Sequence, residues 1–366
     1  MNDPIFLSRS GQIIFRDLQR VITTHQVNLV GSLLKEVEGL VEQGYYAAGF
    51  LSFEAAPAFD PAFKVHEAGE FPLLWFGIYA QKETTKPRKD PAQINIAKSP
   101  WRPLMSPATY HAAFDVIKSS IREGQTYQVN LTFPLEGTLD GSPQELLYGM
   151  FEAQPVDYAA YLDGGANDII SLSPELFWKL DGSRIVSKPM KGTRPRGQHG
   201  HEDRELAHEL QNSPKEMAEN LMIVDMMRND LGKIAKTGSV KVDKIFELED
   251  FRTVWQMTST ISAEVDVSIP LIMRHLFPPA SVTGAPKIKT LELIHTVEPY
   301  PRQVYCGTIG WWAPDRQACF NVAIRTLIRE RANNSTRYSV GSGITWDSDG
   351  EQEYKECLMK AAMLNI

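Results

Sequence analysis

The sequence predicts a soluble globular protein that mixes α-helices with β-strands. Its composition, 43% hydrophobic and 23% charged over 366 residues, is enough to bury a large core, as one large domain or two. Apolar residues recur at helical spacing in 106–121 and 213–238. Residues 126–137 and both flanks of Asp181-Gly182 alternate as strands do.

Charge and cysteine content exclude several classes of protein. The net charge is −7 and the 38 basic residues are spread along the chain, so we expect no nucleic acid partner. Three cysteines without CxxC spacing, Cys306, Cys319 and Cys357, indicate neither a disulfide framework nor a thiolate metal site. The N-terminus lacks signal-peptide features, and no apolar run reaches the roughly 18 residues of a membrane span. We therefore expect a cytoplasmic protein without membrane contact.

The first eighty residues predict a small mixed unit. We expect a strand over 12–15, a helix over 29–43, a buried small-residue stretch over 45–60 and a strand over 73–79. Residues 82–103 are polar with four prolines and read as a surface connection. We therefore divide a single 1–366 catalytic domain into an N-terminal subdomain (1–81), this connection and a core catalytic region (104–366).

A predicted hairpin brings an acid and an amine together. Asp181-Gly182 is a strong two-residue turn signal between strands 176–180 and 183–187. If residue 180 pairs with 183, Glu175 lies opposite Lys188, and Lys191 follows at most about 10 Å along the chain. Glu175 and Lys191 then share one end of the hairpin.

The neighbours of Lys191 favour an amine nucleophile. Lys188, Arg194 and Arg196 crowd it, and nearby positive charge lowers the pKa of a lysine from about 10.4. A lowered pKa is what an amine nucleophile requires. The same residues also fit a solvated basic loop.

Two predicted helices each carry a pair of glutamates three residues apart. Ser213 and Pro214 open a helix that ends at Gly238 and holds Glu216 and Glu219. A second helix, capped by Ser348 or Asp349 after a strand and a glycine-rich bend, holds Glu353 and Glu356. If the pairs meet, they form an oxygen-only site suited to Mg²⁺. Alternatively, Glu216 only completes a capping box with Ser213, and Glu219 is a solvent-facing residue.

An arginine lies inside an apolar run of the C-terminal third. We expect strands over 253–263 and 304–330, separated by a small-residue loop and a helix that opens at Pro286. Arg325 interrupts the run, and a buried arginine needs a carboxylate. That carboxylate could belong to a ligand or to an internal ion pair.

Seven strings resemble the chorismate-utilising enzymes, a family that includes anthranilate, isochorismate, salicylate and aminodeoxychorismate synthases. They cover residues 105–366 in order: SPELF, PMKGTRPRG, ENLMIVDMMRNDLGKIA, FPPASVTGAPKIKTLELI, YCGTIGWW, FNVAIRTL and GSGITWDSDGEQEYKE. The resemblance implies an α+β fold in which two large, mainly antiparallel β-sheets form a sandwich with helices outside. The site would be a cleft whose acidic wall comes from helices 214–236 and 349–363.

Two positions separate the branches of this family. Anthranilate synthases have alanine where this chain has Lys191, and lysine there is similar to aminodeoxychorismate synthases. Isochorismate and salicylate synthases have a water-activating lysine where this chain has Gln128, and an amide is no general base. The resemblance therefore implies conversion of chorismate and ammonia to 4-amino-4-deoxychorismate, a step toward para-aminobenzoate and folate. Anthranilate synthesis, or a catalytically silent ligand-binding subunit of the same fold, is the alternative.

The resemblance also implies residue roles. Lys191 would form a covalent adduct and Glu175 would be the acid, with Mg²⁺ as cofactor. Ammonia would come from solution or from a glutamine amidotransferase subunit, because no cysteine lies in a Gly-x-Cys-x-Gly setting. The metal would be held by Glu216, Glu219, Glu353 and Glu356. The substrate would be bound by Arg325, Tyr305, Gly343, Thr193, Gly284 and Lys287.

Overall fold

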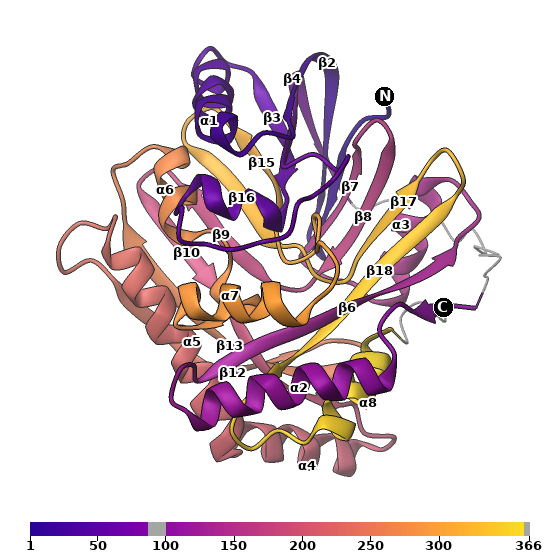
Figure 1. The fold of residues 1–366 in the computed structure, drawn as a ribbon. Coiled ribbons are helices and arrows are strands. Elements are labelled where there is room, and N and C mark those ends of the chain that lie inside the picture. The colour runs from indigo at the N-terminus through magenta and orange to yellow at the C-terminus, as the bar shows by residue number, and fades with distance from the viewer. Residues whose placement is uncertain (87–99, 362–366) are drawn as a thin grey trace.

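The computed structural model describes residues 1–86 and 100–361, and confirms an α+β fold (Figure 1). Most of the predicted connection over 82–103 lies outside the described residues; its first part continues a long strand. The helices are α1 (Val27–Glu42), α2 (Pro107–Arg122), α3 (Pro143–Ala153), α4 (Gly200–Gln211), α5 (Pro214–Gly232), α6 (Ile269–Leu276), α7 (Lys287–Val297) and α8 (Gly350–Lys360), with 3-10 turns η1 (Phe53–Ala58) and η2 (Ala280–Val282).

The strands pair antiparallel throughout. They are β1 (Ile5–Leu7), β2 (Gln12–Thr24), β3 (Tyr46–Leu51), β4 (Leu74–Thr85), β5 (Arg102–Pro103), β6 (Gln128–Thr138), β7 (Tyr158–Asp163), β8 (Asn167–Ser173), β9 (Leu176–Asp181), β10 (Arg184–Lys188), β11 (Met190–Pro195), β12 (Lys241–Asp250), β13 (Val254–Glu264), β14 (Gly284–Ala285), β15 (Thr308–Ala313), β16 (Gln317–Val322), β17 (Thr326–Glu330) and β18 (Ser335–Ile344).

The two expected sheets are joined into one hydrogen-bonded network of 18 strands. One half runs from β12 through β13, β10, β9, β16, β15, β3 and β4 to β2. The other runs from β7 through β8, β17 and β18 to β6. The short β1 pairs with both β2 and β7 and so connects the halves.

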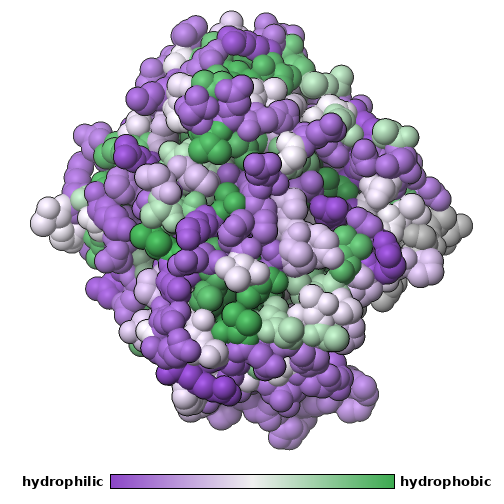
Figure 2. Space-filling view, in the orientation of Figure 1, coloured by the Kyte–Doolittle hydropathy of each residue, from purple (hydrophilic) through white to green (hydrophobic). Residues whose placement is uncertain are grey.

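Apolar side chains from both halves pack between them. Phe15, Phe50 and Trp75 from the first half share one buried cluster with Leu162 and Ile328 from the second. A larger buried cluster lies under the helices. Helices α2 and α8 lie side by side at one end of the molecule, and α1 and α6 lie near the other (Figure 1). Hydrophilic residues cover most of the face in Figure 2.

The predicted elements are mostly present, with different ends. Helix α5 begins as expected, with Ser213 as its N-cap, but ends at Gly232 instead of Gly238. The chain leaves the helix because Ala235 pairs with Val265. Helix α8 is capped by Asp349, whose side chain accepts a hydrogen bond from the Gln352 N–H.

Other differences come from strand pairing. The strand expected over 12–15 continues to Thr24, because β4 pairs along its whole length. The glycine-rich bend expected after Tyr338 is part of β18, which pairs with β6 up to Ile344. We did not predict α4, α6 or β12. No helix within 1–86 and 100–361 is long and apolar enough to cross a membrane.

Candidate active site

The hairpin that carries Glu175 exists, but its register differs from the prediction. Asp181 pairs with Arg184 and Leu180 with Ile185, so the predicted pairing of residues 180 and 183 is wrong. The two turn residues are Gly182 and Ser183 instead of Asp181 and Gly182. A bulge between Val186 and Lys188 then places Lys188 opposite Leu176, next to Glu175. Glu175 and the start of β11 therefore still meet at one end of the hairpin.

A second bulge turns Lys191 out of the regular ladder. Met190 pairs with Thr258 and Thr193 with Gln256, so β11 has one more residue than β13 over this span. The extra residue falls at Lys191-Gly192, where Gly192 has φ +91°. A Cβ on Gly192 would stand 3.1 Å from Oε2 of Glu216, so this position requires glycine for its backbone and for its neighbour. A bulge of this kind re-aims a side chain.

Lys191, Gln128 and Gly343 meet at one point. A Cβ on Gly343 would stand 2.9 Å from Nζ of Lys191 and 2.5 Å from Nε2 of Gln128. Glycine is therefore needed at 343 for the lysine and the amide to approach β18. Gln128 is 1% exposed, and its Oε1 is buried without a hydrogen-bond partner in the described residues. An unpartnered buried acceptor is costly, and such a group fits a ligand site.

Glu175 is a buried carboxyl held beside Lys191. Burial raises the pKa of Glu175 to about 7, against the opposing effects of a Ser281 hydrogen bond, the Lys191 charge and the Met190 N–H. Its own N–H donates to Oγ of Ser173 over 3.2 Å, and its carbonyl accepts from Val322 over 3.0 Å. The backbone is thus fixed, and the carboxyl exchanges its proton near neutral pH.

The cations expected to crowd Lys191 are each paired with a carboxylate. Lys188 pairs with Glu249, Arg194 with Glu216, and Arg196 with Asp203. The groups on which the charge of Lys191 acts to lower the pKa are three carboxylates, Glu175, Glu219 and Glu356. Each of these positive side chains is already paired with its own carboxylate, and proximity in the sequence does not reveal this pairing.

The two glutamate pairs do lie on helices that face Lys191. The positive charge of Lys191 acts to lower the pKa of Glu219 and of Glu356, and the negative charge of Glu353 acts to raise the pKa of Glu219. Burial, with the negative charges of Glu216 and Glu353, raises the pKa of Glu219. Burial of Glu356 is outweighed by Lys360 and Lys191, which lower the pKa of Glu356. Helices α5 and α8 therefore form one acidic wall.

The acidic wall has suitable donors for Mg²⁺ but not a closed metal site. Glu216 is 3.0 Å from Arg194, Glu356 is 2.8 Å from Lys360, and Glu353 accepts from Oγ of Ser348 over 2.7 Å. No group of three or more His, Cys, Asp or Glu in the described residues is placed to hold a metal. Four carboxylates are the hard oxygen ligands that Mg²⁺ prefers. The cation-ligand role of these residues stays a prediction that requires side-chain rotation.

The alternative role of Glu216 as a capping residue is not observed. Oγ of Ser213 accepts a 3.4 Å hydrogen bond from the Glu216 N–H, but the carboxylate turns to Arg194. A full capping box, by contrast, is present at Ser142 and Glu145 on α3.

Arg325 is a cation that pairs with no carboxylate of residues 1–86 and 100–361. It lies between β16 and β17 instead of inside a strand, with φ +51°. Its Nη1 is buried with no hydrogen-bond partner in the described residues, and burial lowers the pKa of Arg325. The internal ion pair considered as an alternative is therefore not observed in residues 1–86 and 100–361. An anionic ligand could complete this site.

Tyr305 lies on the loop that pairs with the segment before Arg325. The Cys306 N–H donates to the Ala323 carbonyl over 2.9 Å, and the Ala323 N–H donates to Gly307 over 3.0 Å. Burial raises the pKa of Tyr305 well above its ordinary value, so the phenol stays a neutral donor.

The remaining predicted substrate residues have structural partners. Oγ1 of Thr193 accepts from Nε2 of Gln256 over 3.1 Å. Gly284 lies in β14 and pairs with Val129 of β6. Nζ of Lys287 is 3.0 Å from Oδ2 of Asp230 and also donates to the Leu276 carbonyl, so it is already paired. The substrate role assigned to Lys287 stays a prediction, and these two contacts use two of the three N–H donors of the ammonium.

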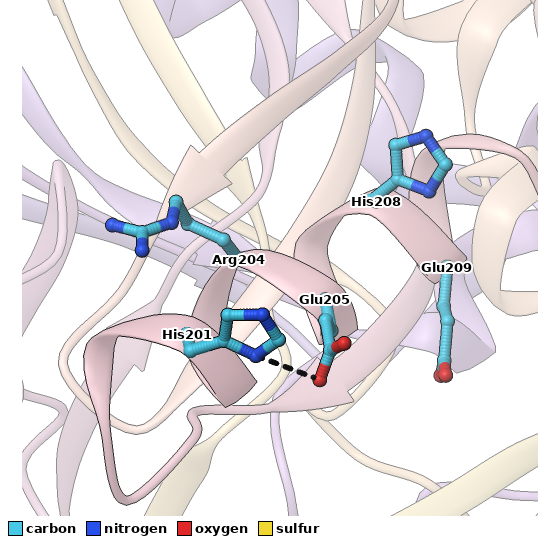
Figure 3. A pocket seen from close by; sticks show the side chains of 5 residues that line it. All are labelled: His201, Arg204, Glu205, His208 and Glu209. Atoms are coloured by element: carbon cyan, nitrogen blue, oxygen red, sulfur yellow. Dashed lines mark ion pairs between the residues drawn. The ribbon is translucent and has the colours of Figure 1, made fainter.

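Two residues of the site carried no functional sequence signal. Ser281 hydrogen-bonds Glu175, and Gln256 holds Thr193. Ser281 stands in a loop of small residues and Gln256 in an ordinary strand, so only the pairing of distant segments reveals them. An open hollow elsewhere is lined by five residues of α4: His201, Arg204, Glu205, His208 and Glu209 (Figure 3). It contains none of the predicted catalytic residues.

Fold and site together define a class of α+β proteins with an amine, a buried acid, an acidic wall and an unpaired guanidinium. Such a site suits a small anionic molecule. The family model for chorismate binding enzyme matches residues 3–365, so this chain belongs to the chorismate binding enzyme family.

Two relatives lie close in sequence to this chain. It is 40% identical over 258 residues to the aminodeoxychorismate synthase of Streptomyces griseus, covering 70% of this chain and 35% of that protein. It is 38% identical over 264 residues to aminodeoxychorismate synthase component 1 of Escherichia coli K12, covering 72% of this chain and 58% of that protein. The matched region is thus about a third to just over half of these relatives.

A third relative and a solved structure widen the comparison. Anthranilate synthase component 1 3 of Haloarcula marismortui is 38% identical over 250 residues, covering 68% of this chain and 49% of that protein. Anthranilate synthase component I of Streptococcus pneumoniae superposes with a TM-score of 0.85 at 22% identity, covering 96% of this chain and 91% of that one. This likeness shows the shared fold.

The raised pKa of Glu175 predicts a pH-dependent stability difference. Because the folded state holds the proton up to about pH 7, ionisation costs stability as pH rises from about 4.5 through 7. Glu175→Gln lacks this titration. Relative to the wild type, its free energy of unfolding should therefore rise by up to about 3 kcal/mol between pH 5 and pH 8. Urea unfolding across this range measures it, and parallel curves for the two proteins would refute the assignment.

Proposed function

We propose that this chain is the chorismate-converting component of an aminodeoxychorismate synthase. The reaction joins chorismate and ammonia to give 4-amino-4-deoxychorismate. The observation that carries the proposal is Lys191, which a strand bulge turns out beside the buried acid Glu175 and against Gly343. Relatives named aminodeoxychorismate synthase support the same reading.

Chorismate is a dianion, and the charges of the site suit it. Arg325 would take the carboxylate of the enolpyruvyl arm, because its guanidinium has no carboxylate in the described residues. Tyr305 and the backbone of Gly343 would add donors. The acidic wall would hold Mg²⁺ through Glu216, Glu219, Glu353 and Glu356. When bound, this cation would neutralise the ring carboxylate and fix its orientation.

The lysine and the acid would act on opposite ends of one displacement that runs through both ring double bonds. The amine of Lys191 attacks ring carbon 2, the two conjugated double bonds shift along the ring toward carbon 4, and the carbon 4–oxygen bond breaks. Glu175 gives its proton to that departing hydroxyl, so water leaves. A carboxyl with a pKa of about 7 has the proton available near neutral pH.

Ammonia would then reverse the displacement. It adds at carbon 4, the double bonds shift back, and the bond from carbon 2 to Nζ breaks with its electrons returning to Lys191. The ionised Glu175 can take the proton that the incoming nitrogen loses. The enolpyruvyl group stays on the ring, and the net change replaces hydroxyl by amine.

The ammonia would come from a glutamine amidotransferase partner or from solution. The three cysteines are poor nucleophiles, because burial raises the pKa of Cys306 and Cys319 to about 12 and of Cys357 to about 11. A thiolate is the reactive form, so none of them suits glutamine hydrolysis. The component naming of the relatives is consistent with a separate subunit.

Anthranilate synthesis is the second candidate, because an anthranilate synthase component is 38% identical over 68% of this chain. It begins from the same substrate but ends with loss of the enolpyruvyl arm as pyruvate. Lys191 in the position where anthranilate synthases have alanine favours the first candidate.

Product identification separates these functions. The chain is incubated with chorismate, Mg²⁺ and ammonium, and the products are identified by mass. We expect 4-amino-4-deoxychorismate and no pyruvate. Release of pyruvate with anthranilate would establish the second candidate, and unchanged chorismate would indicate a ligand-binding subunit.

Covalent catalysis predicts a specific loss in Lys191→Ala. This variant should lose at least about 100-fold in kcat with ammonium as the nitrogen source, because the amine that attacks carbon 2 is gone. If a covalent adduct is trapped on the wild type and detected by intact-protein mass, the same mass increase should be absent from Lys191→Ala. Lys188→Ala on the same hairpin is the matched control and should keep most activity, since Lys188 pairs with Glu249. Full activity of Lys191→Ala would contradict the covalent route.

A further inference from the structure

Arg194 and Glu216 form an ion pair across the acidic wall. Nη1 of Arg194 is 3.0 Å from Oε1 of Glu216 and also donates to the Thr193 carbonyl over 2.9 Å. The pair is partly buried, with the glutamate side chain 14% exposed and the arginine 31%. Arg194 follows Lys191 by three residues on β11, so it approaches the wall from the same strand as the amine.

This pair is one reason why the wall does not form a closed cation site. Glu216 and Glu219 are three apart on α5 and repel each other. Arg194 compensates the first of these charges in the structure as it stands. Glu216 is turned toward β11, and no three carboxylates in the described part of the chain converge.

A guanidinium and a divalent cation cannot share Oε1 of Glu216 at low cost. Mg²⁺ binds oxygens at about 2.0–2.1 Å in near-octahedral geometry and repels a second cation held about 3 Å from the same oxygen. A cation that enters the wall and binds Oε1 of Glu216 must therefore break the ion pair. The cost of breaking it is subtracted from the affinity for the cation.

We propose that Arg194 is an internal counter-ion that Mg²⁺ must displace from Glu216, and that it thereby sets the affinity of the site for Mg²⁺. This positioning role rests on the function proposed above. In the metal-free protein Arg194 stabilises the wall against its own charge. When the metal binds, the carboxylate changes partner and the guanidinium turns away.

The test is direct Mg²⁺ binding by calorimetry without chorismate. Arg194→Gln removes the competing charge, so it should bind Mg²⁺ roughly 5- to 20-fold more tightly than the wild type. Arg194→Lys keeps the charge and should remain within about threefold of the wild type. Arg184→Gln is the matched control, because Arg184 pairs with Asp243 and not with a glutamate of the acidic wall. The affinity of this variant for Mg²⁺ should equal that of the wild type.

Each result decides the proposal. Equal or weaker binding by Arg194→Gln would overturn it, while leaving Mg²⁺ as a cofactor intact. No binding by the wild type and the variants, with or without chorismate, would overturn the metal site and this proposal together. Arg194→Met keeps the aliphatic stem and gives the same comparison should Arg194→Gln not fold. The shift in Tm on adding Mg²⁺ should follow the same order, because a ligand stabilises the state that it binds.

Discussion

The guanidinium of Arg325 is a partly buried charge that no carboxylate of the described residues neutralises, and its Nη1 is fully buried. Burying an unpaired charge costs several kcal/mol, so such a group persists in a fold only when the rest of the structure holds it. Here the chain before it is fixed by paired hydrogen bonds between Ala323 and the Cys306–Gly307 segment. Its left-handed backbone is a second local cost. A bound ligand that supplies the missing negative charge would offset these costs.

The other charges of the site are arranged in the opposite way. The acidic wall collects carboxylates on α5 and α8, and the protein supplies cations to two of them, Glu216 from β11 and Glu356 from α8 itself. Glu175 and Glu219 differ, because burial and not a partner dominates the pKa of each and raises it. The site thus offers a cation that no carboxylate of the described residues pairs with, an acid with a pKa near 7 for proton transfer, and an acidic surface whose charge the protein partly compensates.

The sequence was sufficient to identify those candidate site residues that lie in local patterns. The hairpin near Glu175, the Ser-Pro start of α5 and the Glu-x-x-Glu spacing on both helices are local signals, and the structure contains all of them. The α+β class and the family followed from strings read in order. The unpaired state of Arg325 was one of two outcomes that the sequence left open.

What the sequence did not predict depends on contacts between distant segments. The bulge at Lys191 comes from pairing with β13 some sixty residues later, and the end of α5 from a bridge to Val265. Lys287 pairs with Asp230, while Lys188, Arg194 and Arg196 pair with acids that no local pattern assigns to them. Charge proximity along a chain is a poor guide to charge proximity in space.

Chorismate binding by Arg325→Gln tests the central claim most directly. Calorimetry with Mg²⁺ present and ammonium absent isolates binding from turnover. Loss of a charge-assisted carboxylate contact should weaken the affinity about 10- to 100-fold, while the free energy of unfolding stays equal or rises because a partly buried charge with an unpartnered Nη1 is removed. Arg337→Gln is a suitable control, since Arg337 on β18 pairs with Glu136. An unchanged chorismate affinity in Arg325→Gln, or a large loss of stability, would contradict the account.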